Sequence, residues 1–169
     1  MTISEIYTRI KTLSEISPYY CSTTGTYIEN PWKLFPPAEK DGIIAFEQKG
    51  YSLPEELRAL LLLSNGIEYS CGEQRIYSIE DIITMSDVFK HTYKPGIFNM
   101  GYFWQDWILI DSAHVEGGDY LLYVPDVGKI GYTFGYGFSL FLERLMYGEF
   151  NNFWQWVQNP QKARSFLRP

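Results

Sequence analysis

The chain has 169 residues, of which 46% are hydrophobic and 20% charged, a balance that favours one folded domain and excludes wholesale disorder. It carries 20 aspartates and glutamates against 14 lysines and arginines, a net charge of −6 at pH 7, which opposes direct binding to nucleic acid. Aromatic residues make up 18% of the chain and include 14 tyrosines, too many for every hydroxyl to be buried with a partner, so we expect some on a surface or groove.

The N-terminal segment has the apolar spacing of an amphipathic helix. Ile3, Ile6, Ile10 and Leu13 fall on one helical face, with polar and charged residues between them. Residues 17–37 that follow are rich in proline, turn-forming residues and aromatics. We interpret this stretch as a packed connector, because a disordered linker would carry fewer large apolar groups.

Two helices are predicted next. A short one lies between Pro37 and Gly50, a residue that favours the left-handed end of a helix. Ser52 and Glu55 are spaced three apart, with a proline between them, which is typical of a capping box at a helix start. This second helix is rich in leucine and ends at residues 65–66, Asn-Gly, so we expect it to be the central core helix.

The middle of the chain alternates between strand and helix signals and then becomes rich in strands. Residues 75–77 are a predicted strand, and a helix is predicted to begin at Ser78. Residues 101–110, 120–124 and 129–133 are β-rich runs separated by turns that contain glycine, aspartate and proline. These runs predict an antiparallel meander.

The C-terminal part is predicted to be helical. Apolar residues between 138 and 146 repeat with helical spacing, and Gly148 ends the run. A short terminal helix is predicted around Trp154 and Val157, before a basic tail. Helices, then a sheet, then helices are the order of an α+β fold rather than a doubly wound α/β fold.

Seven short motifs follow one another along the chain. They are Phe46-Glu47, Gly50 to Leu57, Leu63 to Gly66, Ile76 to Ile82, Ile108 to Asp111, Gly118 to Leu121, and Phe138 to Leu142. The ordered series is similar to that of the SUKH superfamily, in its Smi/Knr-like branch. The resemblance covers residues 37–150, which leaves residues 1–36 as an N-terminal helix and aromatic connector and residues 151–169 as a C-terminal helix and basic tail of the same single domain.

The resemblance implies a fold and a class of function. The implied fold is α+β, a single domain with a central, largely antiparallel sheet flanked by helices. The implied activity is binding to other proteins, without catalysis and without a cofactor. Bacterial relatives are commonly immunity proteins that neutralise a cognate toxin, often a nuclease, and fungal relatives act as regulatory interaction proteins in cell-wall signalling.

Acidic and aromatic residues mingle in the predicted meander. Residues 47–126 hold 13 acids and 5 bases, and residues 101–126 hold five acids and no lysine or arginine. Such a surface could occupy the positive cleft of a nuclease, with aromatic side chains as anchors. The partner-binding residues predicted on this basis are Trp104, Asp106, Asp111, Glu116 and Asp119. The alternative is that these acids only keep an aromatic-rich protein soluble and that the tryptophans belong to the core.

Other chemistry has weaker support in the sequence. Asp111 precedes His114 by three residues, which is compatible with an acid/base pair or, with Glu116 and Asp119 nearby, a metal cluster, but equally with a polar hairpin loop. Three hypotheses therefore stand: an immunity protein with a cognate toxin as partner, a basic nuclease domain first; a regulatory or scaffold module that binds a signalling partner or small ligand; and an enzyme built around Asp111 and His114. We predict the first, with no catalytic residue and no metal site.

The cysteines and the hydropathy indicate a cytoplasmic protein without membrane association. Cys21 and Cys71 form no C-x-x-C pattern and have no neighbouring histidine, so neither a disulfide framework nor a zinc site is predicted. The N-terminus is amphipathic and charged, unlike a signal peptide. The longest apolar run, residues 59–63, is far too short to span a bilayer.

Overall fold

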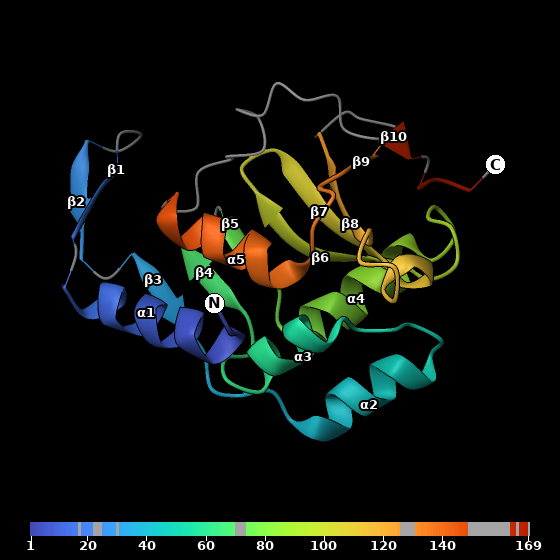
Figure 1. The fold of residues 1–169 in the computed structure, drawn as a ribbon, viewed down its shortest axis with the longest axis horizontal. Coiled ribbons are helices and arrows are strands. Elements are labelled where there is room, and N and C mark those ends of the chain that lie inside the picture. The colour runs from blue at the N-terminus through green and yellow to red at the C-terminus, as the bar shows by residue number, and fades with distance from the viewer. Residues whose placement is uncertain are drawn as a thin grey trace.

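The computed structural model describes residues 1–16, 18–21, 25–29, 31–69, 74–125, 131–148, 163–164 and 166–168 (Figure 1). Within these ranges the elements follow the chain in the order α1 (Ile3–Ile16), β1 (Tyr19–Cys21), β2 (Thr26–Ile28), β3 (Trp32–Leu34), α2 (Lys40–Gln48), α3 (Glu55–Leu61), β4 (Ile67–Tyr69), β5 (Gln74–Ile76), α4 (Ile79–Phe89), β6 (Ile97–Phe103), β7 (Asp106–Asp111), β8 (Leu121–Val124), β9 (Gly131–Thr133), α5 (Phe138–Tyr147) and β10 (Ala163–Arg164). A 3-10 turn, Ser112–His114, follows β7.

The described strands β3 to β10 form one antiparallel sheet in which the spatial order is the order along the chain. Strands β1 and β2 pair separately as a small antiparallel ribbon. The meander predicted for the middle of the chain is confirmed in β6 to β9. Together with the helices, this sheet confirms a single α+β domain with a central antiparallel sheet.

The centre of the sheet is buried on both faces. Along β7, Ile108 and Ile110 belong to the larger core with α1, α3 and α5, while Leu109 belongs to a second cluster with Leu122 and Phe166. Successive side chains of a strand point to opposite faces, so a strand covered on both sides becomes continuously hydrophobic. This explains the apolar run in the middle of β7.

The predicted N-terminal helix is confirmed as α1, and its apolar face lies on other helices. Ile6 and Ile10 are fully buried. In Figure 1, α1, α3 and α5 lie together on one side of the sheet, and each of the three pairs is in contact. The amino group of Met1 lies 3.1 Å from Glu143 Oε2 of α5.

The connector predicted over residues 17–37 contains more strand than expected. Strands β1, β2 and β3 lie within it, and β3 forms one edge of the main sheet. Trp32 of β3 is buried with its ring edge against Tyr69 of β4, 4.8 Å between centroids. Each strand has three residues, too few to show the alternation by which strands are recognised.

The predicted capping box at Ser52 is wrong. The N-cap of α3 is Pro54, with no side-chain cap. Ser52 instead exchanges hydrogen bonds with Ser112: its N–H donates to Ser112 Oγ at 3.0 Å, and its carbonyl accepts from the same hydroxyl at 3.3 Å. Ser52 therefore bonds to a residue 60 positions away in the chain and does not cap α3. The helix predicted to begin at Ser78 is confirmed as α4, and the Ser78 hydroxyl caps it by accepting from the Asp81 N–H.

The helix predicted over residues 138–146 is confirmed as α5, which ends at Gly148. Its first N–H, from Phe138, donates to the buried Tyr120 hydroxyl at 2.7 Å. The terminal helix predicted around Trp154 and Val157 lies outside the described residues. In the part of the chain that is described, none of the helices combines the length and the apolarity that a membrane crossing requires.

Candidate functional site

The structure separates the five residues predicted to bind a partner into two groups. Trp104 and Asp106 lie at the turn from β6 to β7, whereas Asp111, Glu116 and Asp119 lie at the other end of β7 and in its connection to β8. Five steps of about 3.3 Å along β7 place Asp106 about 16 Å from Asp111. The five residues therefore do not form one continuous surface.

The exposure of these residues differs as much as their position. Asp106 is only 4% exposed, and Trp104 is half-buried with a left-handed backbone, φ 59°. Glu116 is exposed. Of the acids proposed for an exposed acidic surface, Glu116 and Asp119 are accessible and Asp106 is not. The part that any of them plays in partner binding stays a prediction.

Asp111 and Asp119 share one cation, Arg164 of β10. Arg164 Nη1 lies 3.3 Å from Asp111 Oδ2 and donates to the Asp119 carbonyl at 2.8 Å, and Nη2 lies 3.0 Å from Asp119 Oδ2. The Asp111 side chain is 8% exposed and that of Arg164 21%. The two acids thus fasten the last described strand to the β7–β8 connection. No sequence pattern pointed to this partner, which is 53 residues from Asp111.

Asp111 is also in contact with His114, three residues later in the chain. His114 Nδ1 lies 2.8 Å from Asp111 Oδ2, and the other oxygen, Oδ1, accepts from the Ala113 N–H. The carboxylate is therefore shared among an imidazole, a guanidinium and a backbone N–H, which suits it to holding the 3-10 turn. Across the described ranges, no three histidine, cysteine, aspartate or glutamate side chains gather in a way that could hold a metal ion.

Replacing Arg164 with methionine is expected to lower the free energy of unfolding by about 1–3 kcal/mol, because it leaves the buried Asp111 carboxylate without its cation. Urea denaturation measures the loss. Arg9→Met is the matched control, since Arg9 makes an exposed bond to the Tyr147 hydroxyl, and there we expect a change within about 0.5 kcal/mol. Equal losses in both variants would contradict a structural role for the Arg164 pairs.

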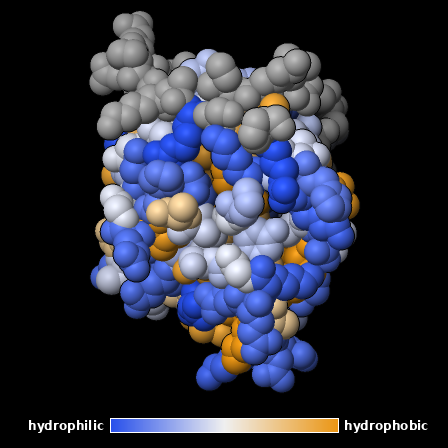
Figure 2. Space-filling view, turned by 90° about the vertical axis from the view of Figure 1, so that its right-hand side faces the viewer, coloured by the Kyte–Doolittle hydropathy of each residue, from blue (hydrophilic) through white to orange (hydrophobic). Residues whose placement is uncertain are grey.

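The described surface holds no large hydrophobic face in the view of Figure 2, where hydrophobic side chains are scattered among hydrophilic ones. The exposed large hydrophobic residues lie mostly on different elements, for example Ile44 on α2, Val88 on α4 and Leu140 on α5. Isolated exposed apolar residues are normal for a folded protein. A binding site is therefore better sought where polar groups line a hollow.

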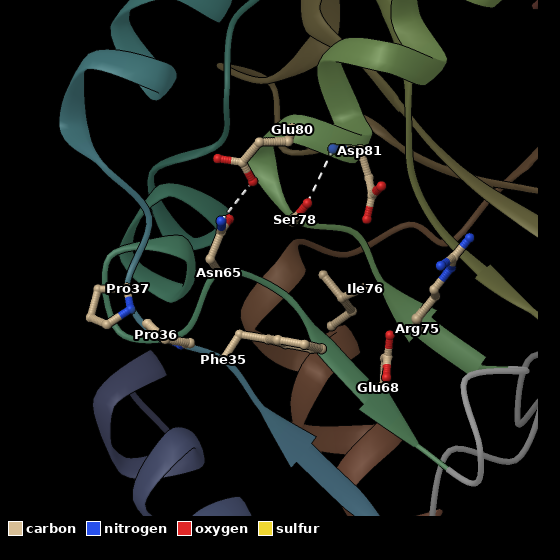
Figure 3. Close-up of a pocket in the computed structure, with 10 residues that line it drawn as sticks. All are labelled: Phe35, Pro36, Pro37, Asn65, Glu68, Arg75, Ile76, Ser78, Glu80 and Asp81. Atoms are coloured by element: carbon tan, nitrogen blue, oxygen red, sulfur yellow. Dashed lines mark hydrogen bonds between the residues drawn. The ribbon is translucent and has the colours of Figure 1, made fainter.

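Such a hollow lies at the edge of the sheet, between β3, the end of α3 and the start of α4 (Figure 3). It has a volume of about 390 Å³ and is lined by residues 35–37, Asn65 and Glu68, residues 75–76, and the first turn of α4 with its cap. We call it the Asn65 pocket. The sequence did not reveal it, since its lining comes from segments that are separate along the chain.

Backbone and side-chain hydrogen bonds fix the walls of the Asn65 pocket. Asn65 Oδ1 accepts from the Ile79 N–H at 2.8 Å, and its Nδ2 donates to Glu80 Oε2 at 2.7 Å, which ties the turn between α3 and β4 to the start of α4. On the opposite wall, the Asn65 N–H donates to the Pro36 carbonyl and the Phe35 N–H donates to Ser64 Oγ. One asparagine thus joins the two walls.

The charge of the Asn65 pocket is predominantly negative. Three carboxylates line it, from Glu68, Glu80 and Asp81, against one guanidinium, from Arg75. Glu68 pairs with Lys33 at 3.2 Å. Glu80 accepts from Asn65, but within the described residues the Asp81 carboxylate has neither a hydrogen bond nor an ion pair. The acid excess over residues 47–126 was the one sequence signal that pointed here.

Arg75 lies at the border of the pocket and on the ring of Tyr77. Its guanidinium carbon is 4.9 Å from the ring centroid. Burial raises the pKa of the Tyr77 hydroxyl, and the charge and hydrogen bond of Arg75 act in the opposite direction. Arg75 Nε is buried and has no acceptor among the described residues. The groups that the pocket offers to a ligand are therefore mainly hydrogen-bond acceptors.

Comparison with known proteins identifies the family. The model of the SMI1 / KNR4 family (SUKH-1) matches residues 37–159, well over half of the chain, and this range includes α2 to α5 and most of the sheet. A comparison with curated proteins gives no significant match. The matched residues contain most of the lining of the Asn65 pocket but not Phe35 and Pro36 of its apolar wall. The chain belongs to the SMI1 / KNR4 family (SUKH-1).

Proposed function

We propose that this protein is a cytoplasmic immunity protein that binds and neutralises a cognate toxin, with a basic nuclease domain as the expected partner. Membership of the SMI1 / KNR4 family carries the proposal, because bacterial proteins of the SUKH superfamily commonly have this role. The function requires binding and no catalytic step of the protein's own. The pair of Asp111 and His114, which hold the 3-10 turn, is accordingly assigned a structural role.

The charge of the protein supports a basic partner. A nuclease holds phosphates in a positive cleft, and a protein with a net charge of −6 is attracted to it at long range. An inhibitor seated in that cleft excludes the substrate. The accessible acid Glu116, in the connection between β7 and β8, is the first of the predicted residues that we propose for this contact.

Co-expression tests the proposal directly. The protein is produced together with the toxin domain encoded next to its gene, cell survival is scored, and the complex is isolated by affinity pull-down. Survival that depends on this protein, together with a stable complex, is the expected result. A neighbouring toxin that neither binds nor is neutralised would remove the immunity function.

Glu116→Lys should weaken the complex with a basic toxin about three- to tenfold and flatten its dependence on salt, because it replaces an attraction with a repulsion. Titration calorimetry at two salt concentrations measures both effects. Glu15→Lys is the control, as it makes the same charge change at an exposed position near the end of α1. If both variants lose affinity equally, only the net charge matters, and the contact at Glu116 is wrong.

A second candidate is a regulatory or scaffold module that recognises a signalling partner or small ligand. The Asn65 pocket favours it, since its volume of about 390 Å³ lies within the ordinary range of ligand pockets and Phe35 provides an aromatic wall. Gene deletion separates the two functions. A growth phenotype in cells without any cognate toxin supports regulation, whereas a phenotype only in the presence of toxin supports immunity.

A further inference from the structure

We propose that the Asn65 pocket receives an arginine side chain presented by the partner protein; the identity of that partner as a toxin rests on the proposed function. The pocket is a hollow of about 390 Å³ with an apolar wall on one side and carboxylates on the other. An arginine side chain has the same division, with three methylene groups below a planar cation.

The apolar wall consists of Phe35, Pro36 and Pro37, which follow β3 (Figure 3). Proline rings provide a rigid surface for methylene groups. The Phe35 ring already attracts a cation of the protein itself, since Lys33 Nζ lies 4.8 Å from its centroid. Aromatic rings bind guanidinium groups by the same electrostatic attraction, with stacking in addition.

The carboxylates supply the acceptors for the guanidinium. Asp81 projects from the first turn of α4, and its two oxygens have no partner among the described residues, so they can accept a bidentate pair of N–H donors. Glu80 adds a second negative charge and is already held in place by Asn65. The charge of Glu68 is compensated by Lys33, so Glu68 adds little to the attraction.

Arg75 does not oppose this arrangement. Figure 3 shows its guanidinium directed away from the proline wall, and its charge is outnumbered by the carboxylates of Glu80 and Asp81. Its buried Nε is out of reach of a ligand in the pocket, so Arg75 acts on a bound cation only through its charge.

The test is a titration of the full-length, isotope-labelled protein with N-acetyl-arginine amide, followed by NMR. We expect saturable shifts in the amide signals of Ser78, Glu80 and Asp81 and in the side-chain amide of Asn65. N-acetyl-citrulline amide, which has almost the same shape without the charge, should bind at least about tenfold more weakly, as expected for loss of a hydrogen bond to a charged group. N-acetyl-lysine amide carries the same charge but cannot donate two parallel hydrogen bonds to one carboxylate, so it should bind more weakly than N-acetyl-arginine amide.

Two variants locate the binding. Asp81→Asn should weaken N-acetyl-arginine amide about three- to tenfold, because a neutral amide accepts more weakly than a carboxylate. The cap at Ser78 is kept, since it involves the Asp81 backbone N–H. Asp87→Asn is the control on the same helix: its carboxylate pairs with Lys49 and does not line the pocket. Shifts elsewhere, equal binding of the citrulline compound, or full affinity of Asp81→Asn would overturn the proposal.

The same variants distinguish this inference from the proposed function. If N-acetyl-arginine amide does not bind but the wild-type protein still rescues cells from the toxin, the pocket assignment fails and the immunity function stands. If the amide binds and no toxin is neutralised, the pocket assignment stands and the immunity function fails. If both hold, Asp81→Asn should also reduce rescue, and Asp87→Asn should not.

Discussion

Replacing Gly66 with alanine is expected to lower the free energy of unfolding by about 2–5 kcal/mol, the combined cost of a left-handed backbone and a steric clash. Gly66 has φ +92°, and a Cβ built there would lie 2.8 Å from the Ile76 carbonyl oxygen and 2.9 Å from the Ser78 nitrogen. Both atoms belong to the backbone, so neither can rotate away. The segment between β5 and α4 would have to shift, and with it one wall of the Asn65 pocket.

Gly50→Ala is the matched control for this substitution. Gly50 has the same φ of +92°, but nothing lies within 4 Å of a Cβ at that position. Only the backbone strain remains there, and we expect a loss of about 1–2 kcal/mol. Urea denaturation of the two variants measures the difference, which isolates the cost of the close approach. Equal losses would show that the end of β5 and the start of α4 can shift to accommodate a Cβ at position 66 at little cost.

Raising the pH from 10 to 12 is expected to destabilise the protein strongly through two buried tyrosines. Burial raises the pKa of Tyr93 to about 12 and that of Tyr120 to about 12; for Tyr120, the bond from the Phe138 N–H acts in the opposite direction. In the unfolded chain both hydroxyls ionise near pH 10. Between these values the folded state retains protons that the unfolded state releases, so stability falls as pH rises, by about 2–3 kcal/mol for each tyrosine.

Denaturant unfolding at pH 8, 10, 11 and 12 measures this loss, and absorbance at 295 nm follows the ionisation. Tyr93→Phe should remove about 2 kcal/mol of the decrease between pH 10 and 12, because phenylalanine cannot ionise. Tyr27→Phe serves as the control, since the Tyr27 side chain is 73% exposed. A Tyr93→Phe protein that loses stability with pH as steeply as the wild type would rule out this tyrosine as a source of the alkaline sensitivity.

The elements that could be predicted from the sequence are those whose signal is local. The apolar spacing of α1 and α5 identifies a buried helical face, and the Ser78 cap involves a residue only three positions away. Ser52 shows the limit of such patterns. It has the right neighbours for a cap, yet Ser112, 60 residues away, takes its hydrogen bonds. Strands of three residues, such as β3 and β4, are set by pairing and leave no periodic pattern.

The same distinction holds for the candidate site. The contact between Asp111 and His114 is local and could be anticipated from their spacing, whereas the pairing of Asp111 with Arg164 depends on how the chain returns to the sheet. The Asn65 pocket is still harder to predict from the sequence, because residues 35–37 and the start of α4 are brought together by the pairing of β3 to β5. An acid excess in the sequence could indicate the charge of such a place but not its location.

The sequential order of the sheet has a consequence for how the chain folds during synthesis. From β3 to β10, each described strand pairs with its neighbour along the chain, so strands can join the sheet in the order in which they leave the ribosome. Short turns close β6 to β9, whereas helices lie in the connections from β3 to β4, from β5 to β6 and from β9 to β10. Helix α1 is different: it is made before these strands, yet it contacts α5, and the Met1 amino group meets a residue 142 positions later. The apolar face of α1 therefore stays exposed until most of the chain has been made. We expect chaperones that bind nascent chains to shield this face.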